Sequence, residues 1–216
     1  LIWKRRAEAS FVVGSSGFTH GLAVHWRAAG LLKMADDFSD PGPVDRLIVM
    51  AGSLSTATEQ QIRWAVGNGF EGIAIEAAAL ADGRSAEPVR AGLFKSALRH
   101  LEAGKSVVLY SARGATAARG AIDRETLGMQ MGKLLRELLT ASRVKRAIIA
   151  GGDTASHAGR ELGAYALTML APIAPGAPLC QAHMTNGNAR GLELVFKGGQ
   201  IGAKDFFGAV RAGKCG

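Results

Sequence analysis

Short apolar runs alternate with longer amphipathic stretches along most of this 216-residue chain. The apolar runs end at Gly, Ser or Asp and predict strands at 11–13, 47–50, 73–75, 107–110, 147–150 and 192–196. Helical periodicity predicts helices at 22–29, 58–66, 89–103, 124–141, 156–162 and 205–212. Because the runs are apolar throughout, both faces of the sheet should be buried. The expected fold class is therefore α/β, a three-layer αβα sandwich with a mostly parallel sheet.

Two segments interrupt this alternation. Residues 36–43 combine Asp, Ser, Pro and Gly, which is typical of a linker. We therefore expect residues 1–35 to form a strand and a helix of another unit, and residues 44–216 to form the main domain. Residues 172–178 contain three prolines and a glycine, which predicts an irregular crossover and not a helix.

The composition excludes several classes of protein. Hydrophobic residues make up 48% and charged residues 20% of the chain, as in folded globular proteins and unlike disordered ones. No apolar run approaches the roughly 18 residues of a membrane span, so no membrane partner is expected. Cys180 and Cys215 fit no metal or redox spacing, which favours a reduced, cytoplasmic protein. The first residue is Leu1 and not Met, which suggests a trimmed N-terminus or a piece of a longer polypeptide.

The net charge of +8 raises the question of nucleic acid binding. The basic residues are scattered in groups of two or three, and aromatic residues make up only 6% of the chain. Such a chain offers no continuous basic groove with stacking platforms, so no nucleic acid partner is expected. A site for a small polyanion, or simple solvation of the surface, accounts for the charge.

Two segments match phosphate-binding motifs in composition but not in position. Residues 67–72 satisfy G-x-G-x-x-G, but they follow a predicted helix and precede a predicted strand, the reverse of the dinucleotide fingerprint. Gly104, Lys105 and Ser106 resemble the end of a P-loop, yet they also connect a helix to a strand. We expect neither to bind phosphate. The five histidines fit no metal-ligand spacing, and no metal site is predicted.

Three short turns rich in Gly, Ser and Thr follow strands of the predicted sheet. They contain Ser53 and Ser55 in the first turn, Gly151, Gly152, Asp153 and Thr154 in the second, and Gly199 in the third. Because the carboxyl ends of parallel strands lie at one edge, we expect the turns to converge there, where open α/β sheets bind ligands. Paired glycines permit close backbone approach, and free amides at a helix start attract an anion. Thr56 and Glu59 are spaced as a capping box for the helix after the first turn.

Each turn also has a purely structural explanation, because glycine turns and Ser or Thr caps are ordinary connections between strands and helices. Asp153 can be a plain cap, since a helix N-terminus favours a carboxylate. It can equally be a group that holds magnesium or handles a proton near phosphate. The residues alone leave both interpretations open.

Five segments together resemble the four-carbon acid sugar kinase family, which includes 3-oxo-tetronate, threonate and erythronate kinases. The segments are VVGSSGFTHGLA (12–23), VMAGSLSTATEQQI (49–62), IIAGGDTASHAGRELG (148–163), IAPGAPL (173–179) and LVFKGGQIGAKDFF (194–207). The resemblance implies a two-domain enzyme, with an N-terminal domain that recognises the acid sugar and a C-terminal domain that binds ATP. Residues 1–35 would be the last strand and helix of an otherwise absent first domain, 36–43 the linker, and 44–216 the nucleotide-binding domain.

The resemblance also implies site residues. The ATP contacts would come from Ser53 or Ser55, Gly151, Gly152, Asp153, Thr154 and Gly199. Asp153 would be catalytic, either by holding Mg²⁺ through water or by assisting the acceptor hydroxyl. The chain departs from the family at 197–202, where KGGQIG replaces the more usual KSGNFG, and at Leu54, where small or polar residues are common.

The expected function is the ATP-binding portion of a kinase that phosphorylates a four-carbon acid sugar. Its cofactors would be ATP and Mg²⁺, its small-molecule partner a sugar acid, and a homo-oligomer is compatible with the sequence. The alternative is a nucleotide-binding or interaction domain without transferase activity of its own.

Overall fold

The computed structural model describes residues 3–7, 11–14, 16–32, 38, 40–111, 122–185 and 191–214. The chain divides into two compact units, Leu1–Phe38 and Ser39–Gly216, which we describe separately. No helix in the described ranges has both the length and the apolar composition of a membrane span.

The described residues of the first unit form a short 3₁₀ helix, η1 (Trp3–Arg5), and an α-helix, α1 (Ser16–Ala28). The rings of Trp3 and Trp26 meet edge to face, with centroids 5.2 Å apart. Residues 11–13 have no regular secondary structure, so the strand predicted there is wrong. The described residues of this unit include no other strand with which 11–13 could pair, and an isolated strand is not stable in water.

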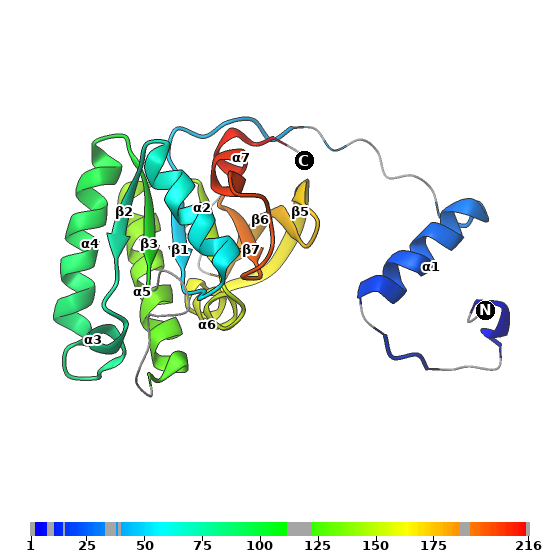
Figure 1. The fold of residues 1–216 in the computed structure, drawn as a ribbon, viewed down its shortest axis with the longest axis horizontal. Coiled ribbons are helices and arrows are strands. Elements are labelled where there is room, and N and C mark those ends of the chain that lie inside the picture. Colours follow the sequence, from blue (N-terminus) through cyan, green and yellow to red (C-terminus); the bar gives the residue numbers. More distant parts are fainter. Residues whose placement is uncertain are drawn as a thin grey trace. The chain divides into compact units, whose positions relative to one another are not determined.

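The second unit alternates strands and helices (Figure 1). Its strands are β1 (Ile48–Ala51), β2 (Phe70–Ala74), β3 (Ser106–Tyr110), β4 (Arg146–Ala150), β5 (Ala164–Ala174), β6 (Ala177–Met184) and β7 (Glu193–Lys197). Its helices are α2 (Thr56–Gly67), α3 (Ala77–Ala81), α4 (Ala86–Glu102), α5 (Arg124–Ser142), α6 (Gly152–Leu162) and α7 (Phe206–Ala212).

The strands form one sheet in the order β2-β3-β1-β4-β7-β6-β5. The five neighbouring strands β2, β3, β1, β4 and β7 are parallel, whereas β6 runs antiparallel to both β7 and β5. Register is continuous at the centre, where Val49 of β1 lies opposite Ile148 of β4, and Ile148 lies opposite Val195 of β7. The predicted mostly parallel sheet is confirmed.

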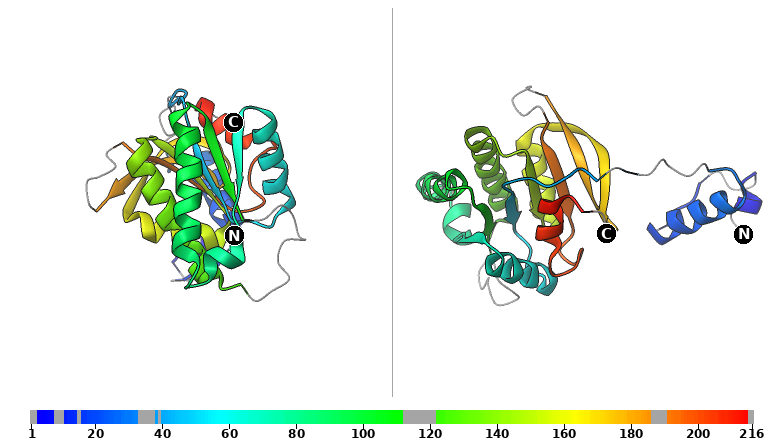
Figure 2. Two further views of the ribbon diagram at one scale, coloured as in Figure 1. Left: turned by 90° about the vertical axis from the view of Figure 1, so that its left-hand side faces the viewer. Right: turned by 90° about the horizontal axis from the view of Figure 1, so that it is seen from above.

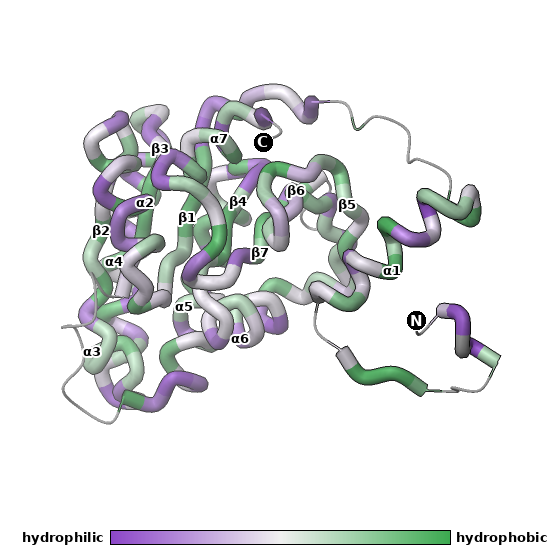
Figure 3. Tube along the Cα trace, turned by 45° about the vertical axis from the view of Figure 1, so that its right-hand side comes forward, coloured by the Kyte–Doolittle hydropathy of each residue, from purple (hydrophilic) through white to green (hydrophobic). Residues whose placement is uncertain are grey.

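Helices cover both faces of this sheet, with α4 and α5 on one side and α2 and α7 on the other (Figure 2, right). Alternate residues of each central strand enter different cores. In β1, Ile48 and Met50 pack toward α4, α5 and α6, while Val49 and Ala51 pack toward α2 and α7. All four side chains are fully buried, which explains why the strand sequence is apolar throughout (Figure 3). The predicted three-layer αβα sandwich is therefore confirmed.

The segment around the three prolines differs from the prediction. Residues 164–184 form the hairpin β5–β6 and no irregular crossover. Gly176, with a φ of +78°, supplies the turn. Pro172 is tolerated because β5 is the edge strand and pairs on one side only, so that a missing N–H need not break a ladder. Neither strand was predicted, and the short helix α3 was also missed.

The two segments set aside as phosphate motifs connect helices to strands, as predicted. Gly69, with a φ of +87°, lies between the end of α2 and the start of β2. Gly104, with a φ of +79°, lies between α4 and β3. Both loops are at the amino ends of their strands, away from the carboxyl edge of the sheet.

Candidate functional site

The candidate site lies between β1 and β4, where the strand order reverses: β3 and β2 lie on one side of β1, and β4 and β7 lie on the other. The strands β1 and β4 are neighbours, yet α2 after β1 packs on one face and α6 after β4 packs on the other. The loops that follow β1 and β4 therefore leave the carboxyl edge toward opposite faces of the sheet. Open α/β sheets bind ligands in the crevice at such a switch point.

The first loop is held by its own serines. Ser55 is the N-cap of α2, and its Oγ accepts a hydrogen bond from the Thr58 amide at 3.1 Å. The Ser53 Oγ accepts one from the Ser55 amide at 3.2 Å. The predicted capping box of Thr56 and Glu59 is wrong, because Ser55 holds the cap and the Glu59 carboxylate pairs with Arg63 at 2.6 Å. The cap is thus one residue earlier than the spacing suggested.

The second loop brings the start of α6 against the first. Gly151 is the N-cap of α6 with a φ of +122°, a conformation that other residues rarely adopt, and no side chain caps this helix. Thr154 is buried, and a Cβ on Gly52 would collide with its hydroxyl. A Cβ on Gly152, in contrast, would meet no atom within 4 Å. The start of α6 is therefore open to a ligand at Gly152 and closed at Thr154.

The third loop completes the convergence. The Gly199 carbonyl accepts hydrogen bonds from the Ser55 hydroxyl at 2.5 Å and from the Thr58 hydroxyl at 2.8 Å. A Cβ on Gly199 would collide with the Ser53 hydroxyl and lie 3.1 Å from the Ser55 Cβ. The Gly151 amide donates to the Lys197 carbonyl at 3.0 Å, which ties the second loop to the third. The structure thus brings together all three predicted turns.

Lys197 was not among the predicted site residues, although it starts the third turn. Its side chain is 1% exposed and lies on the α2 face of the sheet. Its Nζ donates to the Thr58 hydroxyl at 3.0 Å and to the Gly199 carbonyl at 3.3 Å. Burial lowers the pKa of this lysine to about 8. The sequence signal was a lysine directly after the apolar residues 194–196 at the end of the strand.

Asp153 lies at the rim of the site, with a side chain that is 69% exposed. Its carboxylate pairs with Arg124, at the start of α5, at 3.6 Å. It is not the N-cap of α6, because Gly151 holds that position. The described ranges contain no group of three or more His, Cys, Asp and Glu residues that could bind a metal. A cation here would need ligands from a bound molecule in addition to Asp153.

Glycines also set the position of α6. A Cβ on Gly128 of α5 would come 2.7 Å from the Cβ of His157, and one on Gly132 would come 2.7 Å from the Cα of Ala158. On the other side of α6, a Cβ on Gly159 would lie 3.2 Å from the ring of Phe196 in β7. These small residues let α6 pack closely between α5 and β7, which fixes its N-terminus at the edge of the sheet.

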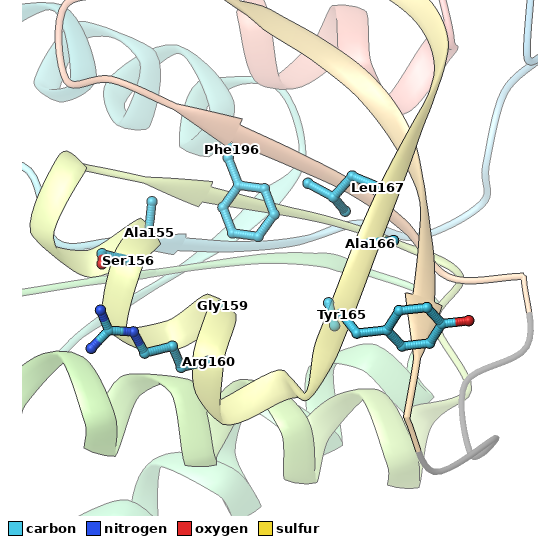
Figure 4. A pocket seen from close by; sticks show the side chains of 9 residues that line it. Ala155, Ser156, Gly159, Arg160, Tyr165, Ala166, Leu167 and Phe196 are labelled. Atoms are coloured by element: carbon cyan, nitrogen blue, oxygen red, sulfur yellow. The ribbon is translucent and has the colours of Figure 1, made fainter.

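A separate pocket of about 420 Å³ lies between α6 and β5 (Figure 4). Phe196 and Leu167 project toward one another across it, and Ala155 and Gly159 form the helical wall. Its helical wall begins at Ala155, the residue directly after Thr154. It contains none of the predicted site residues.

Residues 48–207 match the family of nucleotide-binding C-terminal domains. The chain belongs to the four-carbon acid sugar kinase family, as its nucleotide-binding C-terminal domain. A 3-oxo-isoapionate kinase from Paraburkholderia graminis is 35% identical over 99% of this chain and 48% of its own length. A 3-oxo-tetronate kinase from Cupriavidus necator is 32% identical over 93% of this chain and 46% of its own. The chain thus spans about half the length of these relatives.

A solved structure has the same fold. A protein from Bordetella bronchiseptica, crystallised with citrate as a domain-swapped dimer, is 26% identical and has a TM-score of 0.65. The match covers 80% of this chain and 41% of that one. The resemblance inferred from the five sequence segments is therefore confirmed at the level of the family.

Proposed function

We propose that this chain is the ATP-binding portion of a kinase that phosphorylates a hydroxyl of a four-carbon acid sugar such as 3-oxo-tetronate, threonate or erythronate. The observation that supports this most directly is the convergence of three glycine and hydroxyl loops at the switch point of a family nucleotide-binding domain. Phosphoryl transfer depends mainly on positioning and on stabilisation of charge. Such loops supply both.

The residues present fit a polyphosphate. Gly152 leaves open space over the start of α6, where backbone amides and the helix dipole favour an anion. Ser53 and Ser55 provide hydroxyls at the start of α2, and Gly199 brings the third loop within reach of both. In this proposal the second loop supplies Gly151, Gly152, Asp153 and Thr154: Gly152 and Asp153 face the phosphates, while the buried Thr154 and the Gly151 amide, which is bonded to the Lys197 carbonyl, hold the loop in place. The buried Lys197 adds positive charge beneath them.

Magnesium would be held chiefly by the phosphate oxygens, with Asp153 contributing through water. Mg²⁺ commonly uses one or two carboxylates and retains several waters when it binds a nucleotide. The exposure of Asp153 and its weak pairing with Arg124 leave its carboxylate accessible to such a complex. A role in assisting the acceptor hydroxyl is the second assignment for Asp153 in this proposal.

The acid sugar would be recognised by a domain that is not within residues 44–216. We assign residues 1–35 to the end of that domain and 36–43 to the linker, and place the enzyme in the cytoplasm, with a homo-oligomer as its expected assembly. The alternative function is a nucleotide-binding or interaction domain that transfers no phosphate by itself. The relatives are about twice as long as this chain, so nucleotide binding by this chain alone can be measured separately from phosphate transfer.

Thermal unfolding with and without Mg-ATP tests nucleotide binding, because a ligand that binds the native state raises its melting temperature. We expect a rise at millimolar Mg-ATP, and no rise would refute the proposal. Transfer is tested by coupled ADP release across a panel of four-carbon acids. The chain alone should show negligible turnover, since orientation of the acceptor is worth about 7 to 11 kcal/mol of the barrier. With a separately expressed acid-sugar domain, Asp153→Asn should retain ATP binding but turn over slowly.

A further inference from the structure

Among the residues that the structure describes in the second unit, two basic side chains are almost completely buried, and they lie at opposite ends of the same strand pair. Arg146 begins β4 and Lys197 ends β7, and each is 1% exposed. Arg146 has a counter-ion, because its Nε donates to the Glu193 carboxylate at 2.6 Å, and its Nη1 donates to the Gly42 and Val210 carbonyls. Its charge is thus compensated within the fold.

Lys197 is not compensated in this way. Its two hydrogen-bond acceptors are a hydroxyl and a carbonyl, and it forms no ion pair with any carboxylate in the described ranges. Thr58, which accepts one of these bonds, is in the first turn of α2, where the helix dipole is positive. Burial and the dipole both disfavour an ammonium at this position.

The charged groups on the elements around Lys197 are engaged elsewhere. On α2, Glu59 pairs with Arg63 at 2.6 Å, and on α6, Asp153 pairs with Arg124. Residues 198–203, which follow the lysine, contain no titratable side chain. The two groups that the ammonium contacts, the Thr58 hydroxyl and the Gly199 carbonyl, are neutral. An anion bound across the three loops would be the first negative charge placed beside it.

We propose that Lys197 is the positioning residue of the phosphate site: its ammonium holds the Gly199 carbonyl and the Thr58 hydroxyl, and supplies a charge that a bound polyphosphate compensates. This inference rests on the proposed ATP binding. It assigns the lysine a role that does not require contact with the nucleotide, since the side chain lies beneath the loops. It also makes binding depend on the protonation of Lys197.

A consequence follows near pH 8, where the buried lysine is half protonated in the free protein. A bound polyphosphate favours the charged form, so the complex must take up a proton from solution. Titration calorimetry with Mg-ATP at pH 8, in two buffers of different ionisation enthalpy, measures this uptake directly. We expect about half a proton per nucleotide bound. Binding without uptake would overturn the inference and leave the proposed function standing, whereas no binding at all would refute the proposed function.

Two substitutions separate charge from packing. Lys197→Met removes the titrating group, and Lys197→Arg keeps a charge that does not titrate in this range. Both should abolish the uptake, and uptake that persists in either variant would assign it to another residue. If Lys197→Met does not fold, as circular dichroism would show, Lys197→Arg alone decides the result. Lys105→Met removes a half-exposed lysine at the amino end of β3 and should leave the uptake unchanged.

The pH profile of affinity gives a second readout. The ratio of wild-type to Lys197→Met affinity for Mg-ATP should fall about tenfold between pH 7 and pH 9.5, as the wild-type lysine loses its proton. If Lys197 only supported the loops, Lys197→Met would weaken Mg-ATP binding by the same factor at both pH values. A constant ratio would therefore overturn the inference.

Discussion

The unpaired Lys197 should make the free domain more stable as the pH rises above 8. Its pKa is about 8 in the folded protein and 10.5 in the ordinary reference state. Between these values the unfolded chain binds more protons than the folded one, so the free energy of unfolding increases with pH. A lysine that gains an ion pair on folding has the opposite effect: its contribution to the free energy of unfolding decreases as the pH rises.

The size of the effect follows from the same two values. A difference of 2.5 pKa units corresponds to at most about 3 kcal/mol, because each unit corresponds to about 1.4 kcal/mol. Between pH 7 and pH 9.5 the lysine should contribute about 2 kcal/mol of this total.

Urea unfolding at intervals of half a pH unit, in wild type and in Lys197→Met, isolates this contribution. Cys180, whose pKa burial raises, is common to both proteins, as is every other titratable group. The difference in unfolding free energy between wild type and variant should therefore shift by about 2 kcal/mol in favour of wild type. Lys105→Met should follow the wild-type profile. Parallel profiles for wild type and Lys197→Met would show that the lysine is not destabilised by burial.

Three further predictions concern the glycines of the site. Gly52→Ala should destabilise the domain by about 1 to 3 kcal/mol, because the new methyl group collides with Thr154. Thr154→Ala should recover part of this loss in a double-mutant cycle, and Gly67→Ala, whose methyl group meets no neighbour, should be neutral. Gly152→Val should remove the thermal shift by Mg-ATP without lowering the melting temperature of the free protein, and Gly92→Val on the exposed face of α4 should preserve that shift; equal losses would place the site elsewhere. Gly132→Val should displace α6 and lower both stability and nucleotide binding, and unchanged binding would show that the position of α6 does not define the site.

The parallel part of the fold was predictable because its strands are buried on both faces. Every residue of β1, β3 and β4 is buried, so apolar runs in the sequence mark them directly. The hairpin β5–β6 lacks this signal. The first seven positions of β5 are exposed or only partly buried, and the prolines of the hairpin indicate a break where edge pairing tolerates them.

The three loops were predictable for a related reason. Parallel strands place their carboxyl ends together, so the order of strands and turns along the chain determines which turns share an edge. The detailed contacts were not predictable. The capping role of Ser55 in place of Thr56 depends on where α2 begins, and helix boundaries shift by one or two residues without changing the pattern.

Lys197 shows where residue type alone misleads. A lysine is normally exposed, so the end of a strand followed by two glycines suggests a solvated turn. The alternation of strand side chains gives the opposite answer once β7 is placed in the sheet. Val195 packs toward α2 and α7, and Lys197, two residues later, must lie on the same face. Because α2 covers that face, the ammonium is enclosed against the Thr58 hydroxyl of α2 and the Gly199 carbonyl, and its charge lies inside the domain and not on the surface.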